Sequence, residues 1–429
     1  MADTSTKAET NAVRSREPQA RGAYEEAVLG FREYWYPVCM AGEITGTPKG
    51  FTFLGDPVMM VRRNGEIFAL KDECPHRGTA LSLVNTRKNL EFPGTYTTTC
   101  AYHGWTYDVR DGRCVAVISE GPDSPVPRAN IRARTYPLEI RRGIVWIWMG
   151  SSKPVPVEED IPKLLLDPNA VVKGIHRVKQ GNWRFHAENV SSGHAQMVHK
   201  STLQNWFGPE AGTPAVPVSP FLPVVADDID GNGIDSNSPP PARELRPYPG
   251  LGIWHSKTRW QRFFFGWLPR RRTPVRGAEG VRTLKLMLPG IVRVPNSPIL
   301  GWIYYEWYVP VDELHYIYTQ IMAFWPTSLL NRLTTELKYY FWHKATGPIL
   351  FNNQDAAMVK ATTKFFERTG NMRYLTKVSP NDQLDIVWRE FCDEFARGVG
   401  TAYRPSAARR QNASPELEEV EAAIATGGS

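Results

Sequence analysis

Two cysteine–histidine pairs on neighbouring loops constrain this chain more than any other feature of its sequence. The first pair is Cys74-x-His76 in CPHRG, and the second is Cys100-x-x-His103 in CAYHGW. Zinc sites usually draw two cysteines or two histidines from one short stretch, whereas each loop here supplies one thiol and one imidazole. The two thiolates can therefore bind one metal ion while the two imidazoles bind a second.

That division of ligands is the one of a Rieske [2Fe–2S] centre, where two histidines replace two cysteines on one of the irons. A glycine closes each loop, at Gly78 and Gly104, and the missing Cβ lets the backbone approach the cluster sulfurs closely. The expected ligands of the [2Fe–2S] cluster are Cys74, His76, Cys100 and His103. A zinc-binding interaction protein is the alternative that this pattern leaves open.

Length and composition limit the classes of protein to which this chain can belong. The chain has 429 residues, which is enough for two domains. It shows neither a secretory signal nor an apolar run of about 18 residues, so we predict a cytoplasmic protein. Five cysteines, an odd and sparse set, argue against a disulfide framework. The net charge of +7 comes without a nucleic-acid-binding motif. An arginine cluster at 270–276 suits a solvated loop or a docking face for an acidic partner.

The first part of the chain reads as β-hairpins. Asn64-Gly65, Asp111-Gly112 and Gly143 mark tight turns within residues 57–72, 107–118 and 136–150. The cysteine–histidine loops therefore lie at strand ends. A proline-rich, charged stretch at 151–162 predicts a linker. We expect a disordered segment at 1–22, a first domain at 23–152, a second domain at 153–403 and a disordered tail at 404–429.

The second part mixes helices and strands. Residues 181–200 suit a helical segment, 284–294 and 302–311 read as strands, and the many Pro and Gly residues of 208–250 predict a long, partly mobile loop. Leu329, Leu333 and Leu337 have helical spacing within a predicted helix over 328–344. A second amphipathic helix covers 382–398, with Gly398 as its expected C-terminal stop.

A histidine pair and a distant aspartate form a second set of candidate metal ligands. Non-haem Fe(II) oxygenases bind iron with two histidines and one carboxylate, and leave the other positions open for oxygen and substrate. His194-x4-His199 supplies the pair. Five positions turn a regular α-helix by about 500°, roughly 140° net, so a π-bulge or helix break is expected between these histidines. Asp355 is the expected carboxylate, with a helix N-cap as its alternative role.

Further stretches carry a family resemblance that spans residues 30–403. The chain resembles the catalytic α subunits of Rieske-type aromatic-ring-hydroxylating oxygenases, and is most similar to their carbazole 1,9a-dioxygenase branch. Besides the two loops, the similar stretches are GFREYWYPV (30–38), GNWR with AEN and HK (181–200), EWYVPVDELHY (306–316) and FNNQD (351–355).

The resemblance implies an α+β fold, in which an N-terminal Rieske β-sandwich domain joins a helix-grip catalytic domain with an antiparallel sheet and helices. It assigns the [2Fe–2S] cluster to the two loops and a mononuclear Fe(II) to His194, His199 and Asp355. It also implies a homotrimer that receives electrons from a ferredoxin and an NAD(P)H-dependent reductase.

The chain departs from the family pattern at two places. The family has an aspartate three residues before the first iron-binding histidine, where it bridges to a Rieske histidine of the neighbouring subunit, but this chain has Ser191, followed by Ser192. A serine with an ordered water is the expected substitute, and Glu188 is the alternative carboxylate. The carbazole branch also has three residues between its iron histidines, so an ungapped alignment on His199 would select Ala195 instead of His194.

The expected function is that of a terminal oxygenase. It activates O2 at Fe(II) with electrons from the Rieske cluster and hydroxylates or dihydroxylates an aromatic or other apolar ring. A Rieske monooxygenase that removes O- or N-alkyl groups is one alternative. A Rieske electron carrier with a degenerate mononuclear site is another, which Ser191 favours and the intact His194, His199 and Asp355 oppose.

Overall fold

The computed structural model describes residues 22–83, 91–92, 94–189, 198, 222–237, 275–279, 281, 283–295, 301–369 and 382–398. Apart from residue 22, the two terminal segments predicted to be disordered lie outside these ranges, as does most of the 270–276 arginine cluster. In the part of the chain that the structure describes, no helix is long and apolar enough to cross a lipid bilayer.

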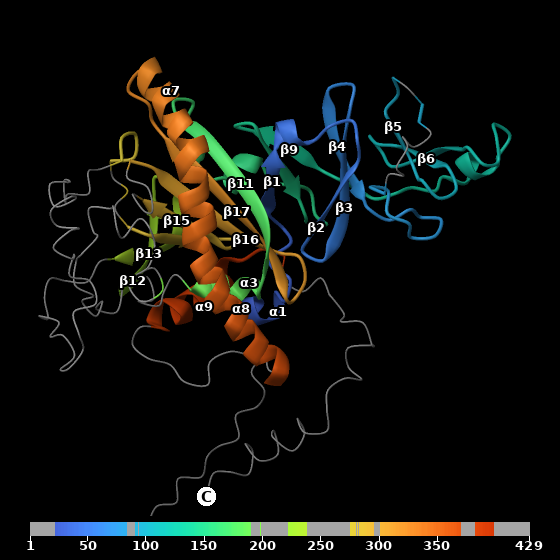
Figure 1. Ribbon diagram of the computed structural model, residues 1–429. Coiled ribbons are helices and arrows are strands. Elements are labelled where there is room, and N and C mark those ends of the chain that lie inside the picture. Colours follow the sequence, from blue (N-terminus) through green and yellow to red (C-terminus); the bar gives the residue numbers. More distant parts are fainter. Residues whose placement is uncertain are drawn as a thin grey trace, which may run out of the picture.

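Three small antiparallel sheets form the N-terminal domain (Figure 1). The first sheet contains β1 (Trp35–Met40), β10 (Ile144–Trp148) and β9 (Leu138–Arg141). The second contains β2 (Lys49–Phe53), β3 (Asp56–Arg63), β4 (Glu66–Lys71) and β8 (Thr135–Tyr136). The third contains β5 (Thr97–Thr99), β6 (Trp105–Asp108) and β7 (Cys114–Val117). Short helical turns accompany them: α1 (Ala23–Glu26), η1 (Ala41–Glu43), η2 (Val126–Ala129) and η3 (Val157–Glu159).

The three predicted hairpin turns are confirmed. Asn64 and Gly65 both take positive φ between β3 and β4, and Arg142 and Gly143 do so between β9 and β10. Gly112, with φ of 74°, lies between β6 and β7. Such left-handed pairs match the right-handed twist of the flanking strands, which explains why these dipeptides are reliable sequence signals.

Strand β3 lies between two hydrophobic cores, because alternate side chains of a strand point to opposite faces. Val58 and Met60 pack into the large core that the two domains share. Met59 and Val61 pack into a second core under the cysteine–histidine loops. Burial on both faces explains the uninterrupted apolar run VMMV, and it fixes the two loops to the rest of the domain.

A seven-stranded antiparallel sheet forms the centre of the second domain. Its strand order is β11 (Val171–Gln180), β17 (His315–Phe324), β16 (Ile303–Pro310), β15 (Ile291–Pro295), β14 (Lys285–Met287), β13 (Gly231–Asn237) and β12 (Leu222–Asp228). The strands predicted at 284–294 and 302–311 are confirmed, since β14 and β15 lie in the first range and β16 in the second. Every residue of β16 is buried, and this includes Glu306.

One long helical run carries Asp355 across the sheet (Figure 1). It consists of α7 (Leu329–Lys338), the π-helical segments η5 (Tyr339–His343) and η6 (Thr346–Phe351), and α8 (Asn352–Thr369). Pro348 lacks the amide hydrogen that an α-helix would need, which favours the irregular hydrogen bonding there. The helix predicted over 328–344 is thus confirmed, but Leu329, Leu333 and Leu337 are exposed in the single chain.

The remaining helices are α2 (Lys163–Leu166), α3 (Trp183–Glu188) and α9 (Gln383–Phe395). The role predicted for Gly398 is wrong. Helix α9 already ends at Phe395, where Ala396 turns to extended backbone. Gly398 takes φ of +68° beside Glu33, and a Cβ on it would lie 2.3 Å from Glu33 Cγ. Close approach to the N-terminal segment therefore requires this glycine.

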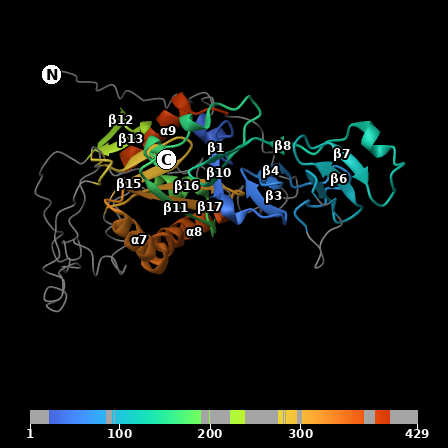
Figure 2. The same ribbon diagram turned by 90° about the horizontal axis from the view of Figure 1, so that it is seen from above.

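The two domains share one core. Trp146 of β10 packs edge-on against Trp307 of β16, with ring centroids 5.8 Å apart. The N-terminal segment also crosses to the second domain, where Trp183 Nε1 donates to the Val28 carbonyl over 3.0 Å. By contrast, β5–β7 lie at one end of the molecule, away from α3 and α8 (Figure 1 and Figure 2).

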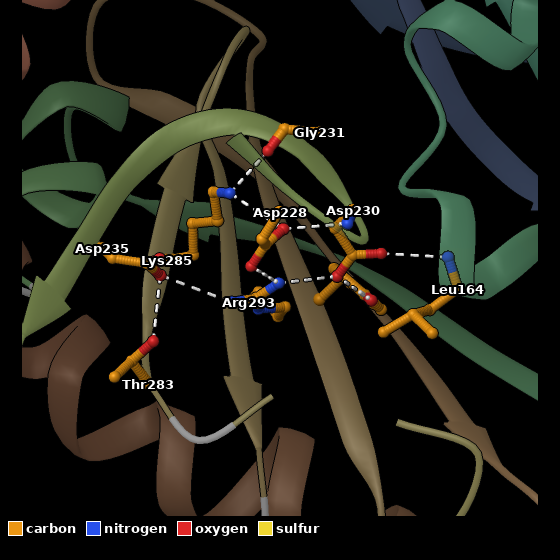
Figure 3. Close-up of polar contacts among 9 residues, drawn as sticks. Leu164, Asp228, Asp230, Gly231, Asp235, Thr283, Lys285 and Arg293 are labelled. Carbon is orange, nitrogen blue, oxygen red and sulfur yellow. Dashed lines mark hydrogen bonds and ion pairs between the residues drawn. The ribbon is translucent and has the colours of Figure 1, made fainter. Parts of the chain in front are cut away.

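A buried group of charges fastens the β12–β13 hairpin to the sheet (Figure 3). Arg293 of β15 is 1% exposed, and its Nη1 lies 2.8 Å from Asp228 and 3.0 Å from Asp230. Lys285 of β14 lies 2.9 Å from Asp228. Two further donors reach Asp230: the Tyr305 hydroxyl over 2.7 Å and the Leu164 amide over 2.9 Å.

This hairpin corrects the prediction of a long loop over 208–250, since 222–237 forms two paired strands. The Pro and Gly content of the region indicated a loop. The charges that hold the hairpin come from β14 and β15, about sixty residues later, so local sequence could not reveal them.

We expect Arg293→Met to destabilise the second domain by about 3–5 kcal/mol, because it leaves a fully buried Asp230 without a cation. Arg132→Met is the control: its ion pair with Asp111 is exposed and should contribute at most about 1 kcal/mol. Chemical denaturation followed by tryptophan fluorescence measures both. Equal, small effects of the two substitutions would show that the buried charges do not stabilise the fold.

Candidate functional site

The two cysteine–histidine loops have the same backbone closure. The Gly78 amide donates to the Cys74 carbonyl over 2.7 Å, and the Gly104 amide donates to the Cys100 carbonyl over 3.1 Å. Both glycines are left-handed, with φ of 71° and 69°. These equivalent turns aim one thiol from each loop at the other.

The thiols of Cys74 and Cys100 interact with each other. Cys74 Sγ lies 3.1 Å from the Tyr107 hydroxyl, and a hydrogen bond from Cys100 together with that of Tyr107 lowers the pKa of Cys74 to about 6. The same pairing with Cys74 raises the pKa of Cys100, since two adjacent thiolates repel each other. A pair whose second ionisation is opposed in this way is suited to a bound cation, which would stabilise both thiolates.

The two imidazoles lie side by side beyond the thiols. The His76 and His103 ring centroids are 4.8 Å apart, and His76 stacks on Trp105 at 4.7 Å. His76 Nδ1 is buried without a hydrogen-bond partner. A buried imidazole nitrogen without a partner is costly unless it binds something, so it fits a metal ligand.

These residues fit a [2Fe–2S] cluster better than a zinc ion. Within the described ranges, no three cysteine, histidine, aspartate or glutamate side chains are grouped as they would be around one metal ion. A [2Fe–2S] cluster needs only two protein ligands on each iron, because bridging sulfides complete the coordination. All five cysteines are buried and form no disulfide.

A second polar site lies where α3 and α8 meet. Asn182 caps α3 by accepting from the Arg184 amide over 3.0 Å, and its own amide donates to Thr363 Oγ1 of α8 over 2.9 Å. One helical turn further along α3, His186 Nε2 lies 3.3 Å from Asn352 Nδ2. The start of α3 is thereby fixed against the face of α8 that carries Asp355.

Asp355 lies in the first turn of α8 and is buried. Its Oδ1 accepts a hydrogen bond from Asn189 Nδ2 over 3.1 Å. The N-cap role considered for Asp355 is wrong, because α8 starts at Asn352 and continues the helical run from η6. A buried carboxylate inside a helix, held from the end of α3, is a suitable metal ligand.

The other residues predicted at this site lie mainly outside the described ranges: Ser191, Ser192, His194 and His199. The π-bulge expected between the two histidines also falls there. Between Asn189 and Leu222 only Val198 is described, as helical.

Glu188 is described, and it forms a buried ion pair. Arg389 Nε donates to Glu188 Oε1 over 2.9 Å, and Arg389 Nη2 to Oε2 over 3.3 Å. The Tyr24 hydroxyl adds a third hydrogen bond of 2.8 Å. The structure thus gives this carboxylate partners from α9 and the N-terminal segment.

The sequence analysis missed the polar groups on the strands behind Asp355. His186 stacks on Tyr308 at 4.3 Å, and its Nδ1 lies 2.5 Å from the Tyr316 hydroxyl. Tyr308 also donates to Glu306 over 2.5 Å. The alternation Tyr304, Glu306, Tyr308 along β16 could have placed these residues on one face, but only the fold shows that α3 and α8 cover that face.

Comparisons with known proteins agree with this architecture. Residues 34–137 match the model of the Rieske [2Fe–2S] domain, and residues 148–207 and 271–400 match that of the homotrimeric ring hydroxylases. The chain belongs to the Rieske-type ring-hydroxylating oxygenases. A [2Fe–2S] cluster and a mononuclear iron are the cofactors of this oxygenase family, so the predicted cofactors and the predicted two-domain fold are confirmed at the level of the family.

Three similar proteins illustrate the reactions found among the relatives of this chain. The terminal oxygenase component of carbazole 1,9a-dioxygenase from Sphingomonas sp is 28% identical over 88% of this chain and 95% of its own length. A reduced complex of oxygenase and ferredoxin from carbazole 1,9a-dioxygenase superposes with a TM-score of 0.69 at 26% identity, over 88% of this chain and 93% of that one. The oxygenase component of dicamba O-demethylase from Stenotrophomonas maltophilia is 31% identical over 40% of this chain and 49% of its own.

We expect Cys74→Ala to remove the visible absorption of the Rieske oxygenase and its paramagnetic signal after reduction, because one iron would lose a thiolate. Cys114→Ala is the matched control, since Cys114 is buried in the same core as Cys74 but lies on β7. Absorption and electron paramagnetic resonance spectra check both variants. An unchanged spectrum in Cys74→Ala would overturn the ligand assignment.

Proposed function

We propose that this enzyme is a terminal oxygenase that inserts oxygen into a fused or linked aromatic ring compound, with the cluster on Cys74, His76, Cys100 and His103 and the mononuclear iron on His194, His199 and Asp355. The substrate class rests on the carbazole 1,9a-dioxygenase components, which match nearly the whole chain. A cytoplasmic location and electron supply by a ferredoxin and an NAD(P)H-dependent reductase belong to the same proposal.

The contact between Asn189 and Asp355 supports the iron site most directly. It joins residues 166 positions apart and brings the end of α3 to the carboxylate over 3.1 Å. In the sequence, His194 follows Asn189 by only five residues. Two histidines and one carboxylate are the ligand set of the non-haem Fe(II) oxygenases.

An iron bound there would supply the reactivity toward oxygen, while the chain supplies position and a dry surrounding. Asn189 holds one carboxylate oxygen of Asp355 and so restricts its rotation. His186, fixed between Asn352 and Tyr316, locks α3 to α8 and to β17. Trp183, Phe185 and Ala187 are buried on the same helix and exclude water behind the site.

We expect Asp355→Ala to lose one iron per chain and nearly all turnover, while it keeps the Rieske spectrum. His199→Ala should behave in the same way. Glu367→Gln is the control, because it changes an exposed carboxylate on the same helix. Iron analysis by mass spectrometry, combined with the visible spectrum, separates the two metal sites. Full iron content in Asp355→Ala would mean that another carboxylate binds the iron, with Glu188 as the next candidate.

Dealkylation is the second candidate reaction, since the family includes the dicamba O-demethylase relative. A panel of carbazole-like heterocycles, biaryls and aryl methyl ethers distinguishes the two reactions. The proposal expects hydroxylated or dihydroxylated rings from the first two groups. Formaldehyde released only from the methyl ethers would instead identify a demethylase.

Electrons must cross between subunits if the Rieske loops of one chain serve the iron of another. Such a route suits the position of β5–β7, which lie away from α3 and α8 within one chain (Figure 1 and Figure 2). We propose Ser191 or Ser192 with an ordered water as the bridge, because Arg389 and Tyr24 already bind Glu188.

We therefore expect Glu188→Gln to destabilise the protein by about 1–3 kcal/mol, the cost of weakening a buried charge-assisted hydrogen bond, and to leave electron transfer from the reduced cluster intact. Ser191→Ala combined with Ser192→Ala should slow that transfer without loss of iron. Single-turnover stopped-flow absorption measures the rate. Loss of transfer in Glu188→Gln alone would identify the glutamate as the bridge.

A further inference from the structure

A segment that precedes both family matches packs against the catalytic domain. This N-terminal strap (residues 22–31) lies before the Rieske match, which starts at residue 34. The strap contains α1, whose four residues are too few for a helix that is stable by itself, so tertiary contacts hold it. Tyr24 and Phe31 are buried, and both pack against Trp183 of α3, with ring centroids 6.1 and 6.2 Å away. In Figure 1, α1 lies at the same end of the catalytic domain as α3, α8 and α9.

Tyr24 is the residue at which the strap contacts both α3 and α9. Its backbone amide donates to Asp393 Oδ1 over 2.8 Å, and its carbonyl accepts from Arg184 Nη2 over 2.5 Å. The guanidinium groups of Arg184 and Arg389 lie over its ring, 5.1 and 5.8 Å from the centroid. With the backbone and the ring held in this way, the hydroxyl has a fixed direction, and it donates to Glu188 Oε1 over 2.8 Å.

Glu188 is the last residue of α3 and immediately precedes Asn189, whose Nδ2 donates to Asp355 Oδ1 over 3.1 Å. Helix α3 has six residues, and so short a helix frays at its ends unless other elements hold it. Arg389 of α9 and Tyr24 of the strap both bind the Glu188 carboxylate. Two elements outside α3 therefore fix a side chain one peptide unit away from the residue that holds Asp355.

The two donors to Glu188 differ in how firmly they can hold it. The Arg389 side chain is 25% exposed and has many rotamers, so the carboxylate could move together with it. Tyr24 is 5% exposed, and a tyrosine has only two side-chain torsions, so its hydroxyl is a rigid second donor. A phenylalanine would fill the same space, so the hydroxyl is not needed for packing. Its hydrogen bond is the part of Tyr24 that reaches the end of α3.

We propose that Tyr24 is a positioning residue of the candidate iron site: its hydroxyl holds Glu188 and thereby keeps Asn189 directed at Asp355. This rests on the proposed role of Asp355 as an iron ligand. Partners that hydrogen-bond a ligating carboxylate orient it and tune the metal. The strap acts one step further out, through the end of α3, so that a segment outside both family matches contributes to the geometry of the catalytic centre.

The affinity and symmetry of the iron site test this role. The homotrimer, with its Rieske clusters intact and its mononuclear iron removed by a chelator, is titrated calorimetrically with Fe(II) under anaerobic conditions. Tyr24→Phe should weaken Fe(II) binding by up to about tenfold, the lower end of the effect of removing a direct partner of a ligand. The electron paramagnetic resonance spectrum of the iron site with nitric oxide bound reports ligand symmetry, and it should differ from that of the wild type.

Tyr34→Phe is the matched control. Tyr34 is 4% exposed, its hydroxyl accepts from the Arg397 amide over 3.1 Å, and the Arg397 guanidinium lies 4.1 Å over its ring. Each variant loses one hydrogen bond, so both should unfold at a lower temperature. Only Tyr24→Phe should change iron affinity and the nitric oxide spectrum. Equal changes at the iron site in both variants would show that a general loosening of the fold, and not the position of Tyr24, is responsible.

A double-mutant cycle tests the path through Asn189. Asn189→Ala removes the hydrogen bond to Asp355 and should itself weaken Fe(II) binding. If Tyr24 acts through Asn189, Tyr24→Phe should add little in that background, because coupled residues are not additive. Fully additive effects would overturn the proposed path. Arg389→Lys is a second variant for the case that Tyr24→Phe does not fold: it keeps the charge but loses the paired hydrogen bonds to Glu188, and should weaken iron binding in the same direction.

The outcomes separate this inference from the proposed function. Unchanged iron affinity and spectrum in Tyr24→Phe, with iron lost in Asp355→Ala, overturn the role of Tyr24 and leave the iron site standing. Full iron content in Asp355→Ala overturns the ligand assignment, and this inference with it. Weaker iron binding in Tyr24→Phe that disappears in the Asn189→Ala background, with Tyr34→Phe equal to the wild type, supports both.

Discussion

Side-chain hydrogen bonds between α3 and α8 fix the geometry of the catalytic domain. Thr363 accepts a hydrogen bond from the Asn182 backbone amide, Asn352 contacts His186, and Asn189 donates to Asp355. Each of these contacts joins segments more than 160 residues apart. They hold Asp355 beside Asn189, which precedes the candidate ligand His194 by five residues in the sequence.

Charge is buried in two different ways on the two sides of the sheet. Around Arg293, the two cations Lys285 and Arg293 form ion pairs with three carboxylates, and these ion pairs stabilise the β12–β13 hairpin. Around Glu306, the hydrogen bonds from described residues come from the neutral side chains of Tyr308, Tyr318 and Gln320. The difference lies in the neighbours and not in the residue type.

Sequence reasoning succeeded where the signal is local. The cysteine–histidine spacing predicted a Rieske centre, which the match to the Rieske domain confirms at the level of the domain, and turns such as Asn64-Gly65 predicted the hairpins. Each of these signals depends on a few adjacent residues. It failed for Gly398 and for the strands inside 208–250, whose conformations depend on Glu33, Lys285 and Arg293 from distant elements. Helical spacing likewise predicted α7 but not that its leucines stay exposed in the single chain. The hydrogen bonds of Glu306 were not predicted for the same reason, since two of its donors, Tyr318 and Gln320, come from the neighbouring strand β17.

The π-helical segments between α7 and α8 have a consequence for how this chain can vary in length. Both ends of the helical run are anchored: Lys173 holds Glu336 on α7 over 3.0 Å, and Thr363 and Asp355 hold α8. One residue more or less in a regular α-helix would rotate Asp355 by about 100° around the axis and turn its carboxylate away from Asn189. A π turn takes up an extra residue without that rotation. A one-residue insertion or deletion over 339–351 can therefore be accommodated by a change between π and α hydrogen bonding. The length of the helical run can then change at this stretch while the Asp355 carboxylate keeps its direction.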